Sequence, residues 1–472
     1  MEETIFSTLH PQQIAKAMNA HWNGCGDAPF LRPVTDSRIA RSGDLFFALK
    51  GEKFDAHDFL PQVIQNGCKA VVISRPLPLP SDVAVFTVDC VETSFADLAR
   101  ALLLERRKRA PFQLIAVTGS NGKTTTKEIL ASIAVELGFH PLKTQGNHNN
   151  DIGLPMTVMD LSYKHDLAIL EMGANHPGDI RRLCTIAPPD LAIITSIGAA
   201  HLEGFLSIDG VARAKSEILE SSSVQYAVLP QNIRNLIEKY RPHTQIRAVG
   251  TDSDFDVENL SADASGIHFT YKSRKFGHSY DLSFPKLGLH NAMNIALAIT
   301  LFESPDAPLD ASRLQRALTR VTLPSGRLEK WKTPLGTTFI HDAYNANPLS
   351  MGEALKLMQH LATPKQRILI LGEMRELGNA SHAFHDKLGK DAAQAQFKKL
   401  LCVGESADIV KNAALKAGAH PDDVYAVSKE ELLSGLEWLA PSLDANDICL
   451  IKGSRGIELE RCLPFFQASK EM

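Results

Sequence analysis

The chain has 472 residues, of which 44% are hydrophobic and 22% charged, and its formal net charge is −4. At about 150 residues per domain, this length and composition indicate roughly three globular domains with sizeable apolar cores. The small negative charge gives no reason to expect nucleic acid or an anionic membrane as a partner.

Residues 1–110 are predicted to form a first unit of short strands and helices. Strands are expected at 44–49, 69–74 and 83–88, with helices near 58–66 and over 94–109. The basic run at 106–109 is interpreted as a solvated helix end. Two polar segments lie at strand edges, 50–57 and the run Thr35, Asp36, Ser37 and Arg38, and on local pattern alone both can be plain turns.

A second unit, residues 111–325, opens on a glycine-rich turn. Residues 114–117 predict a buried strand, Gly119 and Gly122 permit a tight turn, and 123–137 has the composition of a helix. Backbone N–H groups and the helix dipole at such a turn favour an anion, and Lys123 adds a positive charge. The common pattern G-x-x-x-x-G-K-[ST] has glycine where Val117 stands here. An ordinary glycine turn is the alternative, and we favour a shorter variant of a nucleoside triphosphate cradle.

The rest of the second unit continues the alternation of strand and helix. Strands are predicted at 166–170, 190–196 and 226–229, antiparallel segments over 255–285, and a helix over 288–302. Near-continuous apolar strands that alternate with helices indicate a mostly parallel sheet covered on both faces.

Residues 323–326 are predicted to be a linker to a third unit, residues 326–472. Its strands are expected at 337–340, 367–371, 399–403 and 447–451, again separated by helical segments. This alternation is typical of a doubly wound, Rossmann-like domain. The fold class predicted for the chain is therefore α/β, in three domains.

Two polar residues follow apolar strands of the second unit. Ligands of open α/β sheets bind beyond the carboxyl ends of the strands, so Glu171 and His201 are expected to face the same crevice as the cradle. A carboxylate in this position can hold Mg²⁺ in a phosphate-loop enzyme. The alternatives are a surface acid and a loop histidine without a function.

Lys215 lies on a predicted helix over 209–220, where its neighbours at three and four residues are apolar. Such a lysine must extend its amine to solvent, be paired, or be chemically altered. A largely neutral amine could react with carbon dioxide to form a carbamate, which reverses its charge and makes it a metal ligand.

Four further residues lie on either side of the linker at 323–326 and could contact a nucleotide. Asn291 and Asn294 share one helix face, although hydrogen bonding within the core explains them equally well. Arg327 directly follows the linker, so domain movement could bring its bidentate donors onto a phosphate. Asp342 ends the first strand of the third unit, where an acid at a helix N-terminus is also common.

The cysteines and the N-terminus bear on the cellular compartment. The seven cysteines are scattered without a Cys-x-x-Cys pair, which argues for a reducing compartment and against a disulfide framework or a zinc site. The first residues are acidic and lack an apolar signal segment, and no run approaches the ~18 apolar residues of a membrane span. We therefore expect a cytoplasmic protein.

Taken together, these residues resemble the Mur ligase family, the ATP-dependent enzymes that build the peptide of bacterial cell-wall precursors. The resemblance covers nearly the whole chain and rests on an ordered set of positions: Lys123, Glu171, His201, Asn291, Asn294, Arg327 and Asp342. It implies that the cradle binds ATP through Thr118, Gly119, Ser120, Asn121, Gly122, Lys123, Thr124 and Thr125.

The resemblance also implies roles for the remaining residues. Thr124 and Glu171 would serve one Mg²⁺, and His201 and a carbamylated Lys215 a second. The nucleotide would be gripped across the domain interface by Asn291, Asn294, Arg327 and Asp342. The residues implied in catalysis are Lys123, Glu171, His201, Lys215, Arg327 and Asp342.

Within the family, four stretches are similar to the members that join D-alanyl-D-alanine to a UDP-N-acetylmuramoyl-tripeptide through an acyl phosphate. They are TGSNGKTTT (118–126), GNHNNDIGLP (146–155), NANP (345–348) and GEMRELG (372–378). The resemblance assigns Thr35–Arg38 and the 50–57 loop to the UDP end of the substrate, and Asn147 and Asn150 to the path of the peptide. The chain departs from the family pattern at Ala56, Glu373 and Arg375.

Two rival functions stay open. One is a related amide ligase with another acceptor, such as a folylpolyglutamate synthetase, against which the UDP-type segments of the first unit argue. The other is a nucleotide-driven switch or transport ATPase. For the favoured reading we expect a monomer that uses ATP and Mg²⁺, with no nucleic acid or membrane partner.

Overall fold

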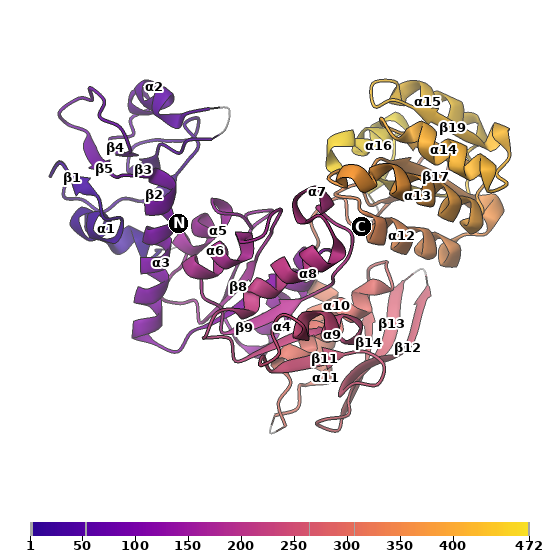
Figure 1. Ribbon diagram of the computed structural model, residues 1–472, viewed down its shortest axis with the longest axis horizontal. Helices are drawn as coiled ribbons and strands as arrows, with labels where there is room; N and C mark the ends of the chain where they lie inside the picture. Colours follow the sequence, from indigo (N-terminus) through magenta and orange to yellow (C-terminus); the bar gives the residue numbers. More distant parts are fainter. Residues whose placement is uncertain (1–2, 52–53, 264, 306, 471–472) are drawn as a thin grey trace.

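The chain folds into three sheets that follow one another in sequence order. The computed structural model describes residues 3–51, 54–263, 265–305 and 307–470, and the N-terminal and C-terminal units lie on either side of the central unit (Figure 1). Each unit is here one sheet with the helices that cover it. Among the described residues, no helix is both long and apolar enough to cross a membrane.

The N-terminal unit has a five-stranded sheet in the order β1-β5-β4-β3-β2, parallel except for the pair β1–β5. Its strands are β1 (His21–Trp22), β2 (Arg32–Val34), β3 (Asp44–Phe47), β4 (Ala70–Ile73) and β5 (Ala84–Thr87). Its helices are α1 (Pro11–Ala17), α2 (Leu60–Gln65) and α3 (Val91–Arg109). Of the loop at 50–57, residues 52–53 lie outside the described residues, and Lys50 and Asp55 form an antiparallel bridge.

The central unit has a nine-stranded sheet in the order β14-β13-β12-β11-β10-β9-β6-β8-β7. The strands are β6 (Gln113–Thr118), β7 (Pro141–Lys143), β8 (Leu167–Glu171), β9 (Leu191–Ile194), β10 (Tyr226–Pro230), β11 (Ile246–Val249), β12 (Phe255–Asp263), β13 (Gly266–Ser273) and β14 (His278–Phe284). The pairs β12–β13 and β13–β14 are antiparallel and the other pairs parallel. The carboxyl ends of β6, β8 and β9 therefore open onto one edge.

Eight helices of the described chain belong to the central unit. They are α4 (Lys123–Leu137), α5 (Gly153–Met159), α6 (Asp179–Ile186), α7 (Leu202–Phe205), α8 (Ile208–Lys215), α9 (Arg234–Glu238), α10 (His290–Phe302) and α11 (Ala311–Arg320). Buried residues of α4 and α10, among them Ile133 and Ile295, share one core with β6 and the antiparallel strands. The other face of the sheet packs against α3 of the N-terminal unit, because Leu98 and Leu102 belong to the same core as Leu170.

The C-terminal unit has a seven-stranded sheet in the order β19-β18-β17-β20-β16-β15-β21, with β15 and β21 antiparallel to their neighbours. The strands are β15 (Glu329–Lys332), β16 (Thr338–His341), β17 (Arg367–Gly372), β18 (Lys399–Val403), β19 (Val424–Val427), β20 (Ile448–Lys452) and β21 (Ser469–Lys470). The helices are α12 (Pro348–Leu361), α13 (Ser381–Ala395), α14 (Ala407–Lys416), α15 (Leu432–Leu439) and α16 (Cys462–Phe465). Separate cores, one with Leu369 and one with Ile370, lie on opposite faces of this sheet.

The predicted α/β fold class is confirmed, and every strand predicted by range is present within a few residues of its expected bounds. Seven strands were not predicted: β1, β2, β7, β11, β15, β19 and β21. Five of the seven lie at the edges of their sheets, where short and half-exposed strands lack a continuous apolar run. The helix expected over 209–220 is also shorter, since α8 ends at Lys215 and a 3₁₀ turn follows.

The basic run at the end of α3 is only partly a solvated helix end. Arg106 is buried, and its guanidinium donates to the carbonyl oxygens of His165 (2.8 Å) and Ala110 (3.0 Å). It thereby fixes the turn that leads from α3 into the central sheet. Periodicity could not reveal this, because the carbonyl of His165 is 59 residues away in sequence.

We expect Arg106→Ala to lower the free energy of unfolding by about 3 kcal/mol, because it leaves buried carbonyl groups without donors. Lys108→Ala is the matched control, because that side chain is exposed and its contact with Glu105 is long, at 3.7 Å. Denaturant unfolding of both variants measures the difference. Equal stability of the two variants would contradict the structural role of Arg106.

Candidate functional site

The glycine-rich turn between β6 and α4 is held against the end of β9. Gly119 has a φ of +144°, and a Cβ there would lie 2.1 Å from Oγ1 of Thr195. The backbone N–H of Ser120 donates to the carbonyl oxygen of Ser196 at 2.9 Å. Gly122 has a φ of +85° and faces the side chain of Asn294. The two glycines are therefore required by conformation and by space, as the sequence predicted.

Lys123 begins α4 and lies over the turn. Its Nζ donates to the carbonyl oxygen of Gly119 at 2.8 Å. Burial lowers the pKa of Lys123, Glu171 opposes that shift, and the charge of Arg327 adds to it. Its ammonium group thus lies among the backbone groups that would surround a phosphate.

Thr124 and Glu171 are joined directly, and the C-terminal unit adds to the pair. The hydroxyl of Thr124 donates to Oε2 of Glu171 at 2.8 Å and accepts from Nη2 of Arg327 at 3.1 Å. Oε1 of Glu171 accepts from the side-chain amide of Asn149 at 2.8 Å. Asn149 was not singled out by the sequence, although it lies within the stretch 146–155 that carried the resemblance.

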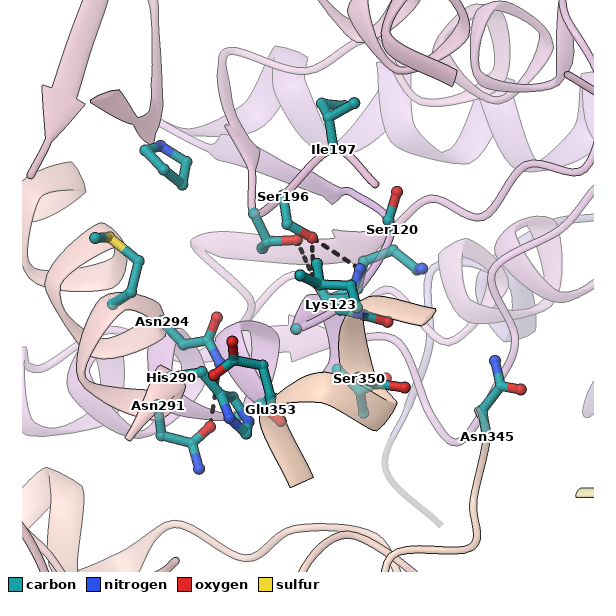
Figure 2. Close-up of a pocket in the computed structure, with 18 of the residues that line it drawn as sticks. Ser120, Lys123, Ser196, Ile197, His290, Asn291, Asn294, Asn345, Ser350 and Glu353 are labelled. Carbon is teal, nitrogen blue, oxygen red and sulfur yellow. Dashed lines mark hydrogen bonds between the residues drawn. The ribbon is translucent and has the colours of Figure 1, made fainter. Parts of the chain in front are cut away.

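A cavity of about 1390 Å³ opens beside the cradle, between the central and C-terminal units. Figure 2 shows Lys123 of the central unit near Ser350 and Glu353 of the C-terminal unit. The expected site residues that line it are Ser120, Asn121, Gly122, Lys123, Thr124, Thr125, Asn147, Asn150, Glu171, His201, Asn291, Asn294, Arg327 and Asp342. Thr118, at the end of β6, and Gly119, in the turn, do not line the cavity.

A reciprocal amide pair also joins the cradle to the C-terminal unit. The side chain of Asn121 donates to Oδ1 of Asn347 at 3.0 Å, and Asn347 donates back at 2.6 Å. Asn347 is also the N-cap of α12, where its Oδ1 accepts from the backbone of Ser350. It belongs to the stretch 345–348 quoted from the sequence, where no role was assigned to it.

The two asparagines of α10 form one buried hydrogen-bonded row (Figure 2). Asn291 donates to the carbonyl oxygen of Leu287 at 2.8 Å, and Asn294 donates to Oδ1 of Asn291 at 3.1 Å. This leaves Oδ1 of Asn294 against Gly122. Both asparagines therefore hydrogen-bond within the protein interior and also line the cavity. The two alternatives drawn from the sequence apply together.

Arg327 and Asp342 project from the C-terminal unit. The guanidinium of Arg327 lies 4.2 Å from the centre of the Tyr344 ring, which supports it from one side. Asp342 pairs with Lys452, a buried lysine at the end of β20, with Nζ and Oδ2 2.7 Å apart. Lys452 was missed by the sequence because nothing local distinguishes it from an ordinary strand end.

His201 lines the cavity and contacts the C-terminal unit. Its φ is +52°, and its Nδ1 is 2.5 Å from Oε2 of Glu376. The contact with this ring lowers the pKa of Glu376. This contact between the two units was not predicted.

Lys215 does not reach solvent, which excludes the alternative that its amine is extended to water. The residue is 1% exposed, and its Nζ lies 3.4 Å from the carbonyl oxygen of Ala174 and 5.5 Å from the centre of the Phe205 ring. Burial, and next the charge of Lys123, lowers the pKa of Lys215 to about 7. Burial thus favours the neutral form of this amine.

The Thr124–Glu171 pair and the surroundings of His201 differ in how well they could bind a cation. The hydroxyl of Thr124 and the carboxylate of Glu171 are the hard oxygen donors that Mg²⁺ takes together with phosphate oxygens and water. Within residues 3–51, 54–263, 265–305 and 307–470, no group of three or more His, Cys, Asp or Glu side chains could hold a metal ion. A second cation near His201 would thus need a further ligand, such as a carbamate on Lys215.

The residues expected at the UDP end lie apart from this cavity. Thr35, Asp36, Ser37 and Arg38 follow β2 in the N-terminal unit and do not line the cavity. The guanidinium of Arg38 pairs with Asp36 at 2.7 Å, and its hydrogen bond lowers the pKa of Asp36 to about 2. Asn147 and Asn150 line the cavity, and Oδ1 of Asn150 accepts from the backbone N–H of Gly153 at 2.8 Å.

We expect Gly119→Ala to abolish binding of ADP and to lower the melting temperature, because its Cβ would collide with Thr195. Gly138→Ala is the matched control. Gly138 is the C-cap of the same helix and has a φ of +96°, but nothing lies within 4 Å of the place where a Cβ would stand. Calorimetric titration with ADP separates the two variants. Normal ADP binding by Gly119→Ala would contradict the close approach at β9.

Comparisons with known proteins agree with this arrangement. A family model described as the Mur ligase middle domain matches residues 117–302, and one described as the Mur ligase, glutamate ligase domain matches residues 326–455. The UDP-N-acetylmuramoyl-tripeptide–D-alanyl-D-alanine ligase of Bacillus subtilis is 35% identical over 90% of this chain and 91% of its own. The enzyme of that name from Escherichia coli is 34% identical over 96% of this chain and 97% of its own.

Solved structures give the same result. A crystal structure of MurF from Acinetobacter baumannii matches with a TM-score of 0.86 and 33% identity, over 96% of this chain and 98% of that one. The MurF ligase from Thermotoga maritima in complex with ADP matches with a TM-score of 0.79 and 26% identity, over 92% of this chain and 97% of that one. A folylpolyglutamate synthase from Mycobacterium tuberculosis shares the fold over 80% of this chain, at 18% identity and a TM-score of 0.61.

Proposed function

The chain belongs to the Mur ligase family, and we propose that it joins D-alanyl-D-alanine to a UDP-N-acetylmuramoyl-tripeptide in peptidoglycan precursor synthesis. The reaction is ATP-dependent and releases ADP and phosphate. The observation that carries this function is the bond from Arg327 to Thr124, because it brings two units of the chain onto one nucleotide cradle. Relatives that carry this activity in their names match nine tenths or more of the chain.

The first step is attack by the C-terminal carboxylate of the tripeptide on the γ-phosphoryl group of ATP. The products are an acyl phosphate and ADP, and two anions must approach each other to form them. Lys123 and Arg327 supply the positive charge that reduces this repulsion. Mg²⁺, held by Thr124 and Glu171, would supply further charge neutralisation on the phosphates.

The second step is attack by the amine of D-alanyl-D-alanine on the acyl carbon. A peptide bond forms, phosphate leaves, and the amine loses a proton. Because an acyl phosphate hydrolyses readily, the reacting groups must be shielded from water before the first step. Contact of the C-terminal unit with the cradle through Asn347 and Arg327 supports such shielding.

Lys215 is proposed to be a carbamate in the active enzyme. Its neutral amine would attack carbon dioxide, form an N–C bond and release one proton, which leaves a carboxylate on the nitrogen. Burial at 1% exposure and a pKa of about 7 support this reaction, since an unprotonated amine is required. The carbamate and His201 would then hold a second Mg²⁺.

The remaining assignments are part of the same proposal. The units are proposed to be domains at 1–110, 111–325 and 326–472, which bind the UDP end of the substrate, bind ATP, and complete the ligase site. Thr35, Asp36, Ser37 and Arg38 would contact the UDP end, and Asn147 and Asn150 the peptide. Asn291, Asn294 and Asp342 would hold the nucleotide, in a cytoplasmic monomer.

The rival functions make different demands on substrates. A switch or transport ATPase hydrolyses ATP alone, whereas the proposed ligase releases phosphate only when both co-substrates are present. We expect phosphate release with UDP-N-acetylmuramoyl-tripeptide and D-alanyl-D-alanine together, and background release when either is omitted. A set of UDP-tripeptides and a folate acceptor in the same assay separates the amide ligases from one another.

In this assay Lys123→Ala is expected to lose phosphoryl transfer by several orders of magnitude while it keeps the melting temperature of the wild type. Lys108→Ala is the control for loss of one positive charge, because that side chain is 73% exposed, lies in the last turn of α3 and does not line the cavity. Turnover near the wild-type rate in Lys123→Ala would overturn the assignment of the cradle.

Lys215→Ala is expected to be inactive, and short carboxylic acids in the buffer are expected to restore part of the activity by replacing the carbamate. The direct measurement is the carbamate carbon signal by NMR in ¹³C-bicarbonate, present in the wild type and absent in Lys215→Ala. An active wild-type enzyme without that signal would refute the carbamate and leave the ligase function standing.

A further inference from the structure

The lysine and arginine side chains of the cavity wall differ in whether the protein itself neutralises them. Among the described residues, those that line the cavity are Lys123, Arg182, Arg327, Lys452 and Arg455. The first four donate to carbonyl, hydroxyl or carboxylate oxygens of the protein. Within the same described chain, Arg455 has no such oxygen partner, and its exposed side chain lies 5.5 Å from the centre of the Tyr344 ring. One guanidinium group therefore faces the cavity without an anion.

The backbone that carries Arg455 is held firmly by the C-terminal unit. Arg455 begins a short 3₁₀ turn that follows β20. Just before it, the backbone N–H of Ser454 donates to the carbonyl oxygen of Glu373 at 3.0 Å. A Cβ at Gly453 would lie 2.9 Å from Cα of Gly372, so the segment also packs closely against the end of β17. The guanidinium group is thus presented to the cavity from a fixed support.

The ring of Tyr344 relates Arg455 to the phosphate end of the site. The Cζ atoms of Arg327 and Arg455 lie 4.2 and 5.5 Å from the centre of this ring. Arg327 marks the phosphate end, because it also donates to the hydroxyl of Thr124 on the cradle. An extended dipeptide spans about 7 Å from its amine to its carboxylate. A dipeptide whose amine approaches an acyl carbon beside Arg327 can therefore bring its carboxylate to Arg455.

The side-chain amide of Asn345 is a second donor on this part of the wall. Its Oδ1 accepts from the backbone N–H of Ala346 at 2.8 Å, which leaves the NH₂ group for a ligand. Asn345 is exposed, lines the cavity and lies apart from Lys123 in Figure 2. Its carbonyl oxygen accepts from Nζ of Lys452 at 3.2 Å, which ties this segment to the end of β20 and hence to the support of Arg455.

We propose that Arg455, together with the side-chain amide of Asn345, binds the carboxylate of the acceptor dipeptide. A guanidinium group matches a carboxylate in shape and donates two parallel hydrogen bonds to it. The carboxylate of D-alanyl-D-alanine takes no part in the new peptide bond, so it is the group by which the dipeptide can be held while its amine reacts. The bound anion also reduces the repulsion between the guanidinium groups of Arg455 and Arg327. The proposal rests on the proposed function, because it concerns the acceptor of that reaction.

An anchor of this kind selects acceptors by their length and by their C-terminal group. D-alanine alone is too short, because its carboxylate on Arg455 would keep its amine away from the acyl carbon. A dipeptide that ends in an amide leaves the guanidinium group without its anion and loses charge-assisted hydrogen bonds. Arg455 would therefore determine which amines are accepted and have no part in the transfer of the phosphoryl group.

The test is phosphate release by the full-length enzyme, with either D-alanyl-D-alanine or its C-terminal amide as the acceptor. We expect the KM of the wild type to be about 10- to 100-fold lower for the acid than for the amide. Arg455→Gln is expected to raise the KM for the acid to that for the amide, with unchanged KM values for ATP and the UDP-tripeptide. Arg455→Lys keeps the charge and is expected to restore part of the preference. Arg461→Gln is the matched control, because this exposed arginine lies in the same segment and does not line the cavity.

Several results would overturn the proposal and leave the ligase function standing. They are equal use of acid and amide by the wild type, a wild-type preference for the acid in Arg455→Gln, an equal loss in Arg461→Gln, and a higher KM for ATP or the UDP-tripeptide in place of the dipeptide. A purely structural role would lower kcat and the melting temperature of Arg455→Gln and keep the preference for the acid. A wild type that uses neither form of the dipeptide would overturn the proposed function itself, and this assignment with it.

Discussion

The hydrogen-bond chain from Arg327 through the hydroxyl of Thr124 to Glu171 is the interaction on which the site depends. It joins the first residue after the linker to the start of α4 and to the end of β8. The hydroxyl accepts from a cation and donates to an anion, so a neutral group links the two opposite charges. Since Thr124 and Glu171 are both buried, the arrangement would be costly if either neighbour were removed.

The central sheet makes this chain possible because its topology places β6 between β8 and β9. The carboxyl ends of these three strands supply the cradle, Glu171 and the segment that leads to His201. A parallel arrangement is required, since antiparallel neighbours would send these residues to opposite edges. The shared core with α3 and the buried Arg106 hold the N-terminal unit to the other face of the same sheet.

Much of this arrangement could be predicted from the sequence. The apolar runs of β6, β8, β9, β17 and β18 indicated buried strands, and Gly119 and Gly122 indicated the turn, because each signal is local. Edge strands such as β7 and β19 gave no such signal. The partners of the predicted residues were also invisible: Asn347, Lys452 and Glu376 are identified only by side chains far away in sequence that the fold brings to them.

Lys215 shows how burial and a neighbouring charge together favour a neutral amine. A lysine placed among apolar side chains loses hydration of its charged form, and the nearby charge of Lys123 lowers its pKa further. The proposed carbamate would consume that neutral amine, and this would account for a lysine buried at such a cost. Conversion to a carbamate would replace the destabilising cation at the end of α8 with an anion.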